Sequence, residues 1–180
     1  MLSLSNRTIV QNAWVVNDLE EAMTRWTRVF GIGPFFCNPD IRVSDPRYRG
    51  QPTELRFAGA IAQAGSVQVE LIQVLNEVPS CYRDLVPAGR EAMHHIAVFA
   101  DDFDAEVARY TAQGFPVAFS GANRDMRFAY MDTSSALGVM VEILEDVESV
   151  RTAFANIKAV CDTWDGVTDP IRGSAMRPTA

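Results

Sequence analysis

Apolar and polar positions along the chain follow an order that occurs twice. Residues 10–19 and 94–103 each contain an apolar strand pattern, an Asp and then the start of a helix with an apolar stripe. Asp18 and Asp102 stand where the helices begin, and their side chains can accept the free backbone N–H groups of the first turn. A glycine is expected to end each helix. The sequence therefore predicts two copies of one β–α unit.

Each predicted helix is followed by further strand patterns, which are residues 53–62 and 66–75 in the first half and 116–120, 126–132 and 138–144 in the second. Each half is therefore one strand, one helix and two or three more strands. Modules of this size are near the lower limit for an independent core, so we expect the two to pair. The fold class that follows is α+β.

The last part of the chain has a different pattern, with apolar residues at alternating steps of three and four, which are Val147, Val150, Phe154, Ile157, Cys161 and Trp164. This stripe predicts a helix whose apolar face packs either on its own domain or against a second subunit. The expected divisions are residues 1–75 for the first module, 76–91 for a linker, 92–146 for the second module, 147–165 for the C-terminal helix and 166–180 for a flexible tail.

Composition limits the partners of the chain. Its 180 residues carry a net charge of −7, which argues against nucleic acid or an anionic membrane surface as a general partner. Neither a signal peptide nor an apolar run long enough to span a bilayer is evident, and the three cysteines form no Cys-x-x-Cys pair. We therefore expect a cytoplasmic protein with reduced cysteines. The two histidines, His94 and His95, exclude any site that needs several imidazoles.

Strand alternation singles out two carboxylates. Glu70 lies opposite the face formed by its apolar neighbours, and Glu142 shares a face with Met140 and Leu144. A carboxylate within an apolar strand either meets solvent on an open sheet face or has a cation to neutralise it.

The repeat places four polar residues at equivalent positions. Gln11 and His95 lie in the first strand of their halves, and Glu70 and Glu142 lie in the last. If the halves pair about a pseudo-twofold axis, the four side chains converge. One imidazole, two carboxylates and one amide oxygen form a plausible set of ligands for a divalent ion such as Zn, Ni, Co, Mn or Fe. His94 points to the opposite face if its strand is regular, where it would pack or hydrogen-bond beneath the sheet.

Six segments of the chain resemble the vicinal oxygen chelate superfamily, which includes glyoxalase I, methylmalonyl-CoA epimerase, extradiol dioxygenases and bleomycin-resistance proteins. The segments are Gln11–Glu20 (QNAWVVNDLE), Gly31–Phe35 (GIGPF), Val69–Ile72 (VELI), His94–Val98 (HHIAV), Arg127–Asp132 (RFAYMD) and Gly138–Ile143 (GVMVEI). The resemblance covers about residues 7–146 and is greatest for the epimerase-like branch. It implies two paired βαβββ modules whose mixed sheet curls into a cleft around a metal ion.

The resemblance places the metal ligands at Gln11, Glu70, His95 and Glu142. The epimerase pattern has a histidine where Gln11 stands, whereas one class of glyoxalase I resembles the set present here. Glu54 roughly matches the position of a second carboxylate base in the epimerase, although a solvent-exposed Glu54 is the alternative.

Four further residues could line a substrate cleft, namely Tyr48, Arg49, Arg127 and Tyr130. The alternative for each is a surface or packing role, since Arg and Tyr often cover apolar surface with their polar tips in water.

The choice of ligands favours one class of reaction. Extradiol cleavage uses two histidines and a carboxylate around Fe(II), and adjacent histidines on a regular strand let only one reach the metal. Proton abstraction next to a chelated carbonyl or thioester fits better, with Glu142 as ligand and base and Glu54 as a possible opposite base. The sequence thus predicts a metal-dependent isomerase or lyase that acts on a small molecule, and we expect a homodimer. The alternative is a metal-free binding protein like the bleomycin-resistance relatives.

Overall fold

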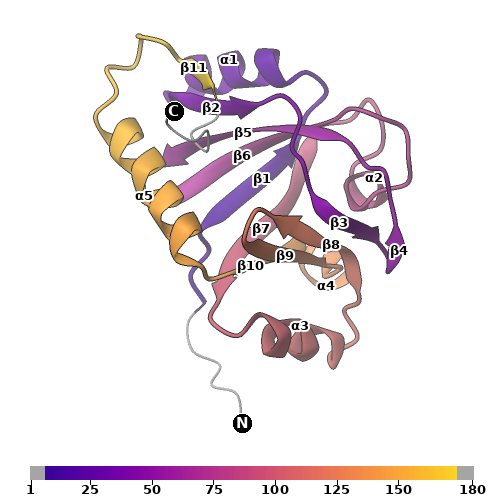
Figure 1. Cartoon of the computed structure of the whole chain (residues 1–180). Helices are drawn as coiled ribbons and strands as arrows, with labels where there is room; N and C mark the ends of the chain where they lie inside the picture. The colour runs from indigo at the N-terminus through magenta and orange to yellow at the C-terminus, as the bar shows by residue number, and fades with distance from the viewer. Residues whose placement is uncertain (1–6, 174–180) are drawn as a thin grey trace.

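The computed structural model describes residues 7–173 and contains one curled, eleven-stranded mixed sheet (Figure 1). The first half comprises β1 (Gln11–Val15), α1 (Leu19–Phe30), β2 (Phe35–Asn38), β3 (Ser44–Tyr48), β4 (Gln51–Pro52), β5 (Phe57–Ala64) and β6 (Val67–Val74). The remainder comprises α2 (Cys81–Leu85), β7 (Ala92–Ala100), α3 (Phe103–Thr111), β8 (Val117–Asn123), β9 (Met126–Met131), α4 (Ser134–Leu137), β10 (Met140–Glu145), α5 (Glu148–Asp162) and β11 (Ile171–Gly173).

The sheet consists of two equivalent halves. One contains the strand order β2-β5-β6-β1 and the other the order β7-β10-β9-β8, and β1 and β7 join them as antiparallel neighbours. In each half the first strand runs parallel to the last, as β1 does to β6 and β7 to β10. These are the two paired βαβββ modules that the sequence predicts, and the α+β fold class is confirmed.

Helix caps appear where the repeat places them. The Asp18 carboxylate accepts from the backbone N–H of Glu21 at 2.8 Å, and Asp102 accepts from Ala105 at 3.0 Å. Gly31 ends α1 in the left-handed conformation with φ of 74°. Helix α1 covers β5 and β6, while α3 covers β9 and β10.

Alternation along the strands separates the two faces of the sheet. Val69 and Leu71 of β6 join the core under α1, whereas Val141 and Ile143 of β10 join the core under α3. The residues between them face the concave side of the sheet. Glu70 of β6 and Glu142 of β10 are therefore directed toward the hollow between the modules.

The first module also extends into the second. Strand β3 leaves the first half and pairs with β8 at the far edge of the sheet. The segment between residues 76 and 91, expected to be a linker, contains helix α2, whose Cys81 and Tyr82 are fully buried. This segment is thus part of the core as well as a connection.

The C-terminal helix packs on its own chain. Val150, Phe154 and Ile157 turn toward the concave side of the sheet, and Trp164 packs on Gly33, where a Cβ atom would lie 2.6 Å from the indole ring. Of the two partners considered for the apolar stripe, its own domain is the one observed.

The segment after residue 166, expected to be a flexible tail, differs from that expectation. Residues Ile171–Gly173 form β11 and pair in parallel with β2 at the edge of the sheet. An edge strand exposes unpaired N–H and C=O groups, and β11 satisfies those of β2. Residues 174–180 of the expected tail lie outside the described residues. None of the helices within residues 7–173 is long and apolar enough to cross a membrane.

Candidate metal and ligand site

Four adjacent strands supply the polar residues at the centre of the concave face. Gln11 stands on β1, Glu70 on β6, His95 on β7 and Glu142 on β10, and these strands are consecutive in the sheet order β6-β1-β7-β10. The structure therefore brings together the four residues that the repeat pairs, one from each of the four central strands.

His95 lies between the two carboxylates. Its Nε2 atom is 3.2 Å from a carboxylate oxygen of Glu142 and 3.4 Å from one of Glu70. One ligand atom from each of the three residues can be chosen so that all lie within 4.8 Å of one another. His95 is fully buried and Glu142 is 6 % exposed.

The surroundings of His95 and Glu70 raise the pKa values of both groups. Burial alone would lower the pKa of His95, but the carboxylates of Glu142 and Glu70 outweigh it and raise the pKa to about 9. Burial raises the pKa of Glu70, which the imidazole partly offsets. Without a metal, a protonated His95 therefore supplies positive charge between the two acids.

A β-bulge brings the second histidine to the same place. His95 pairs with Ala13 of β1, whereas Met93 pairs with the next residue, Trp14, so that His94 is the extra residue of the bulge. The expectation that His94 points to the opposite face applied to a regular strand, and the bulge removes that condition, whereas the expected packing and hydrogen bonding of His94 are observed. The Nδ1 atoms of His94 and His95 lie 3.0 Å apart, and both side chains are buried.

Hydrogen-bond partners determine the tautomers of the pair. The Nε2 atom of His94 lies 3.0 Å from the backbone carbonyl of Cys81, which can only accept, so this nitrogen carries the proton. Burial lowers the pKa of His94 to about 3, which keeps the ring neutral and leaves its Nδ1 as an acceptor. His95 therefore donates from Nδ1, and its Nε2 faces Glu70 and Glu142.

Gln11 is oriented by its neighbour on β6. Its Nε2 group donates to the Oε1 atom of Gln68 at 3.2 Å, and both side chains are buried. The amide oxygen of Gln11 is thereby left as the atom it can offer to a cation.

A cavity opens above these residues and encloses about 110 Å³ of free space. Gln11, Glu70 and Glu142 line it together with Tyr130, while His95 lies behind the carboxylates. Apolar side chains from both modules and from α5 form the rest of the wall, including Phe57, Phe128, Leu144, Phe154 and Ile157. Helix α5 runs along the ends of β5, β6 and β1 (Figure 1), and its inner side chains line the cavity on this side.

The sequence profile of the Glyoxalase/Bleomycin resistance protein/Dioxygenase superfamily matches residues 10–130, which is more than half of the chain. The chain belongs to this superfamily. No curated protein sequence is significantly similar to it.

Several solved structures share this fold. The methylmalonyl-CoA epimerase from Mycobacterium tuberculosis is similar with a TM-score of 0.55 and 18% identity, over 84% of this chain and 97% of the epimerase. Another methylmalonyl-CoA epimerase has a TM-score of 0.51 and 21% identity, over 78% and 95%. A hypothetical protein from Bacillus halodurans C-125 has a TM-score of 0.54 and 15% identity, over 80% and 97%. At these identities the likeness concerns the fold.

Members of the glyoxalase superfamily typically bind a divalent metal ion, and the residues present here fit one. The Nε2 atom of His95 is buried without a hydrogen-bond partner, although one carboxylate oxygen each of Glu142 and Glu70 lies 3.2 and 3.4 Å away. A cation bound by imidazole, carboxylates and an amide oxygen would satisfy this atom.

Tyr130 is the one member of the predicted cleft group that lines the cavity. Burial raises the pKa of its hydroxyl well above the ordinary value, and its oxygen lies 3.4 Å from that of Tyr82. Within residues 7–173, the other three members of the group are not among the residues that line this cavity.

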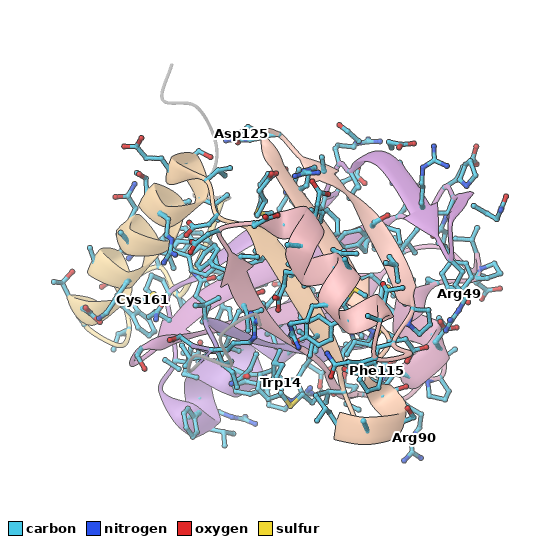
Figure 2. The ribbon with its side chains drawn as sticks, turned by 90° about the horizontal axis from the view of Figure 1, so that it is seen from below. Trp14, Arg49, Arg90, Phe115, Asp125 and Cys161 are labelled. Atoms are coloured by element: carbon cyan, nitrogen blue, oxygen red, sulfur yellow. The ribbon has the colours of Figure 1, made fainter. Side chains whose placement is uncertain are left out.

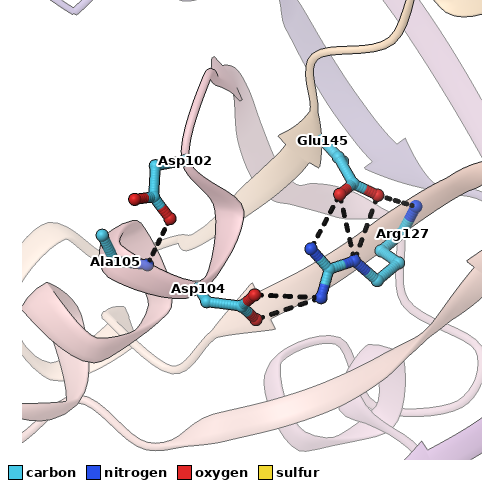
Figure 3. Close-up of polar contacts among 5 residues, drawn as sticks. All are labelled: Asp102, Asp104, Ala105, Arg127 and Glu145. Atoms are coloured by element: carbon cyan, nitrogen blue, oxygen red, sulfur yellow. Dashed lines mark hydrogen bonds and ion pairs between the residues drawn. The ribbon is translucent and has the colours of Figure 1, made fainter.

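Those three side chains are held elsewhere. Arg127 points away from the cavity and forms ion pairs with Glu145 at 2.7 Å and Asp104 at 3.0 Å (Figure 3). Tyr48 donates to Asp84, and Arg49 bridges Asp84 and Asp132 at 2.7 and 2.9 Å.

The location of Arg49 follows from the path of β3. Figure 2 places Arg49 at the end of the molecule opposite Cys161 of α5. Because β3 pairs with β8 rather than with its own module, the residues after it are carried away from the centre of the sheet.

Glu54 is also separate from the four central residues. It lines a surface groove with Arg56 and Asn76 that adjoins the central cavity at Ile41 and Val43, and Glu54 itself is not among the residues that line the cavity. Sequence reasoning missed two contributors to the site, the carbonyl of Cys81 and the cavity-facing side of α5. The apolar stripe predicts that one face of α5 is buried, but it does not indicate which surface of the protein that face contacts.

Proposed function

We propose that this chain is a metal-dependent isomerase or lyase that removes a proton next to the carbonyl group of a small molecule. The observation that carries the proposal is the position of Glu70, His95 and Glu142, whose ligand atoms lie within 4.8 Å of one another beside an apolar cavity. Gln11 is proposed as a fourth ligand through its amide oxygen.

Each residue has a definite part in this proposal. A bound divalent ion would hold two substrate oxygens and stabilise the negative charge that develops on them. Glu142 lines the cavity and accepts the substrate proton, while Glu70 and His95 would hold the ion. The apolar wall excludes water from the reacting carbon, which strengthens the electrostatic interactions at the site.

A single base can remove a proton from one face of the substrate and return it to the same face. Epimerisation by two opposed bases would need a second acid or base across the cavity, and Glu54 lies in a different surface groove. The proposal therefore favours an isomerase in which Glu142 both removes and returns the proton, whereas in a lyase Glu142 would remove the proton and a group on the neighbouring carbon would leave.

Metal analysis of protein purified without chelator tests the first part. We expect about one divalent ion per chain, and we expect His95→Ala to lose it while the exposed variant Glu148→Ala retains it. A persistently empty wild-type protein would overturn the metal site. Exchange of carbon-bound protons of small hydroxyketones in D₂O, followed by NMR, tests the chemistry. That exchange should require the metal and should be lost in Glu142→Gln.

A metal-free binding protein is the second candidate, and one observation favours it. A protonated His95 between Glu70 and Glu142 already supplies positive charge to the two carboxylates without any ion. Thermal stabilisation by a ligand that is the same with and without EDTA, in a protein that exchanges no substrate proton, would support this function over catalysis.

A further inference from the structure

The wall of the central cavity is apolar apart from a small number of polar side chains. Beyond the residues at its centre, the polar residues that line it are Asn38, Asn123 and Tyr130. Throughout residues 7–173 no lysine or arginine lines it. A bound molecule would therefore meet mainly hydrocarbon and a few neutral hydrogen-bonding groups.

The charges at the centre of the cavity are already balanced. Glu70 and Glu142 together would neutralise one divalent ion. Without the ion, the imidazole of His95, 3.2 and 3.4 Å from the two acids, could bring at most one positive charge to two carboxylates. In neither state does the site have positive charge to spare for an anionic ligand.

The arginines expected from the sequence to meet a substrate do not change this balance. Arg127 is paired with Glu145 and Asp104, and Arg49 is paired with Asp84 and Asp132. An anionic group within the cavity would thus lose its hydration without gaining a cationic partner, which is costly.

We infer that the ligand of this site is an uncharged, mostly hydrocarbon molecule of about one ring in size, with two neighbouring oxygens at one end. The pair of oxygens rests on the proposed metal-dependent function, whereas the absence of charge rests on the lining of the cavity. The free space of about 110 Å³ is somewhat smaller than an apolar cavity of about 150 Å³ that accommodates benzene, so one ring is the upper limit of what it holds.

Two isosteric probes test the charge requirement. Both are 2-hydroxyacetophenones, one with a neutral nitro group and the other with a carboxylate at the ring carbon farthest from the chelating oxygens. We expect calorimetry with the nickel(II)-loaded protein to give at least tenfold tighter binding of the nitro compound. Equal or tighter binding of the carboxylate, or no binding of either probe, would overturn the inference.

A charged variant with a matched control sharpens the test. Val43 lines the cavity, whereas the next residue, Ser44, is exposed and outside it. Val43→Arg should reduce the preference for the nitro compound about tenfold, and Ser44→Arg should leave it unchanged. Equal effects of the two variants would contradict the inference. If Val43→Arg does not fold, the comparison of the two probes on the wild-type protein still tests whether the site prefers an uncharged ligand.

The same samples separate this inference from the proposed function. A metal-loaded protein that shows no preference would overturn the inference alone. A protein that binds no metal but still prefers the neutral probe in EDTA would overturn the metal-dependent function and support a neutral ligand.

Discussion

The Nδ1 atoms of His94 and His95 lie 3.0 Å apart within a β-bulge, and this contact fixes which nitrogen of His95 faces the carboxylates. The carbonyl of Cys81 holds the proton of His94 on Nε2, so His94 can only accept from its neighbour. Hydrogen bonds that run from the Cys81 carbonyl through His94 to His95 thus orient His95, the proposed metal ligand. Partners outside the ligand set commonly orient ligating histidines in this way.

His94→Leu should weaken the binding of zinc(II) by about 10–100-fold, because the acceptor that orients His95 is lost. Competition with a coloured chelator measures the change. His94→Asn places an amide oxygen near the lost Nδ1 atom and should recover part of the affinity. Equal affinities of the Leu variant and the wild-type protein, with both folded by circular dichroism, would show that the contact does not position His95.

Metal binding should become stronger as the pH rises. The pKa of His95 in the metal-free protein is about 9, so a proton must leave Nε2 before an ion can bind. The apparent dissociation constant should therefore fall about tenfold per pH unit between about pH 6.5 and 8.5. Calorimetry in buffers with different heats of ionisation should also detect the released proton. A dissociation constant independent of pH would contradict this.

The stability of the metal-free protein should change in the opposite direction. The pKa of His95 is raised on folding from 6.5 to about 9, so its stabilising contribution is fully present below pH 6.5 and is lost as the pH rises through 9. The increase in the thermal midpoint caused by zinc(II) should consequently be larger at pH 8.5 than at pH 6.5. In His95→Gln this difference between the two pH values should disappear.

Helix α5 should contribute to folding through its inner face. Ile157 is 2 % exposed, and Ile157→Ala should lower the free energy of unfolding by about 2–4 kcal/mol because it leaves a void beside the sheet. Lys158 is the next residue and is exposed, and Lys158→Ala should change stability by less than about 0.5 kcal/mol. Urea denaturation measures both values, and similar values for the two variants would indicate that α5 does not pack as described.

Two adjacent residues of β9 point to opposite faces of the sheet. Met126 lines the cavity, whereas Arg127 pairs with Glu145 and Asp104 on the other face. Met126→Ala should weaken binding of the nitro-substituted hydroxyacetophenone by about 5–30-fold through lost apolar contact. Arg127→Met should leave binding within about twofold. A larger loss of binding in Arg127→Met than in Met126→Ala would instead indicate that Arg127 contacts the ligand.

Periodicity predicted the fold because each module repeats the same local signals. Caps at Asp18 and Asp102 and strict alternation around Glu70 and Glu142 are local properties, and they were sufficient to indicate two paired modules of one strand, one helix and two or three further strands. The convergence of Gln11 with the other three polar residues followed from the symmetry of the repeat.

Features that depend on irregular or distant pairing could not be predicted in this way. The bulge at His94 breaks the two-residue period, and β3 pairs with β8 rather than with a strand of its own module. The second pairing carries Arg49 away from the cavity. The position of Glu54 in a separate groove likewise depends on how residues 38–56 cross the surface.

Strand β11 gives α5 an attachment at both of its ends. One end continues from β10 of the second module, and the other leads to Ile171–Gly173, which pairs with β2 at the edge of the first. The intact ladder therefore restrains outward movement of the helix. A three-residue ladder at a sheet edge belongs to the parts of a protein that open at the smallest free-energy cost. We therefore expect the C-terminal strand to govern how quickly a ligand enters and leaves, while the cavity wall governs how tightly it is held.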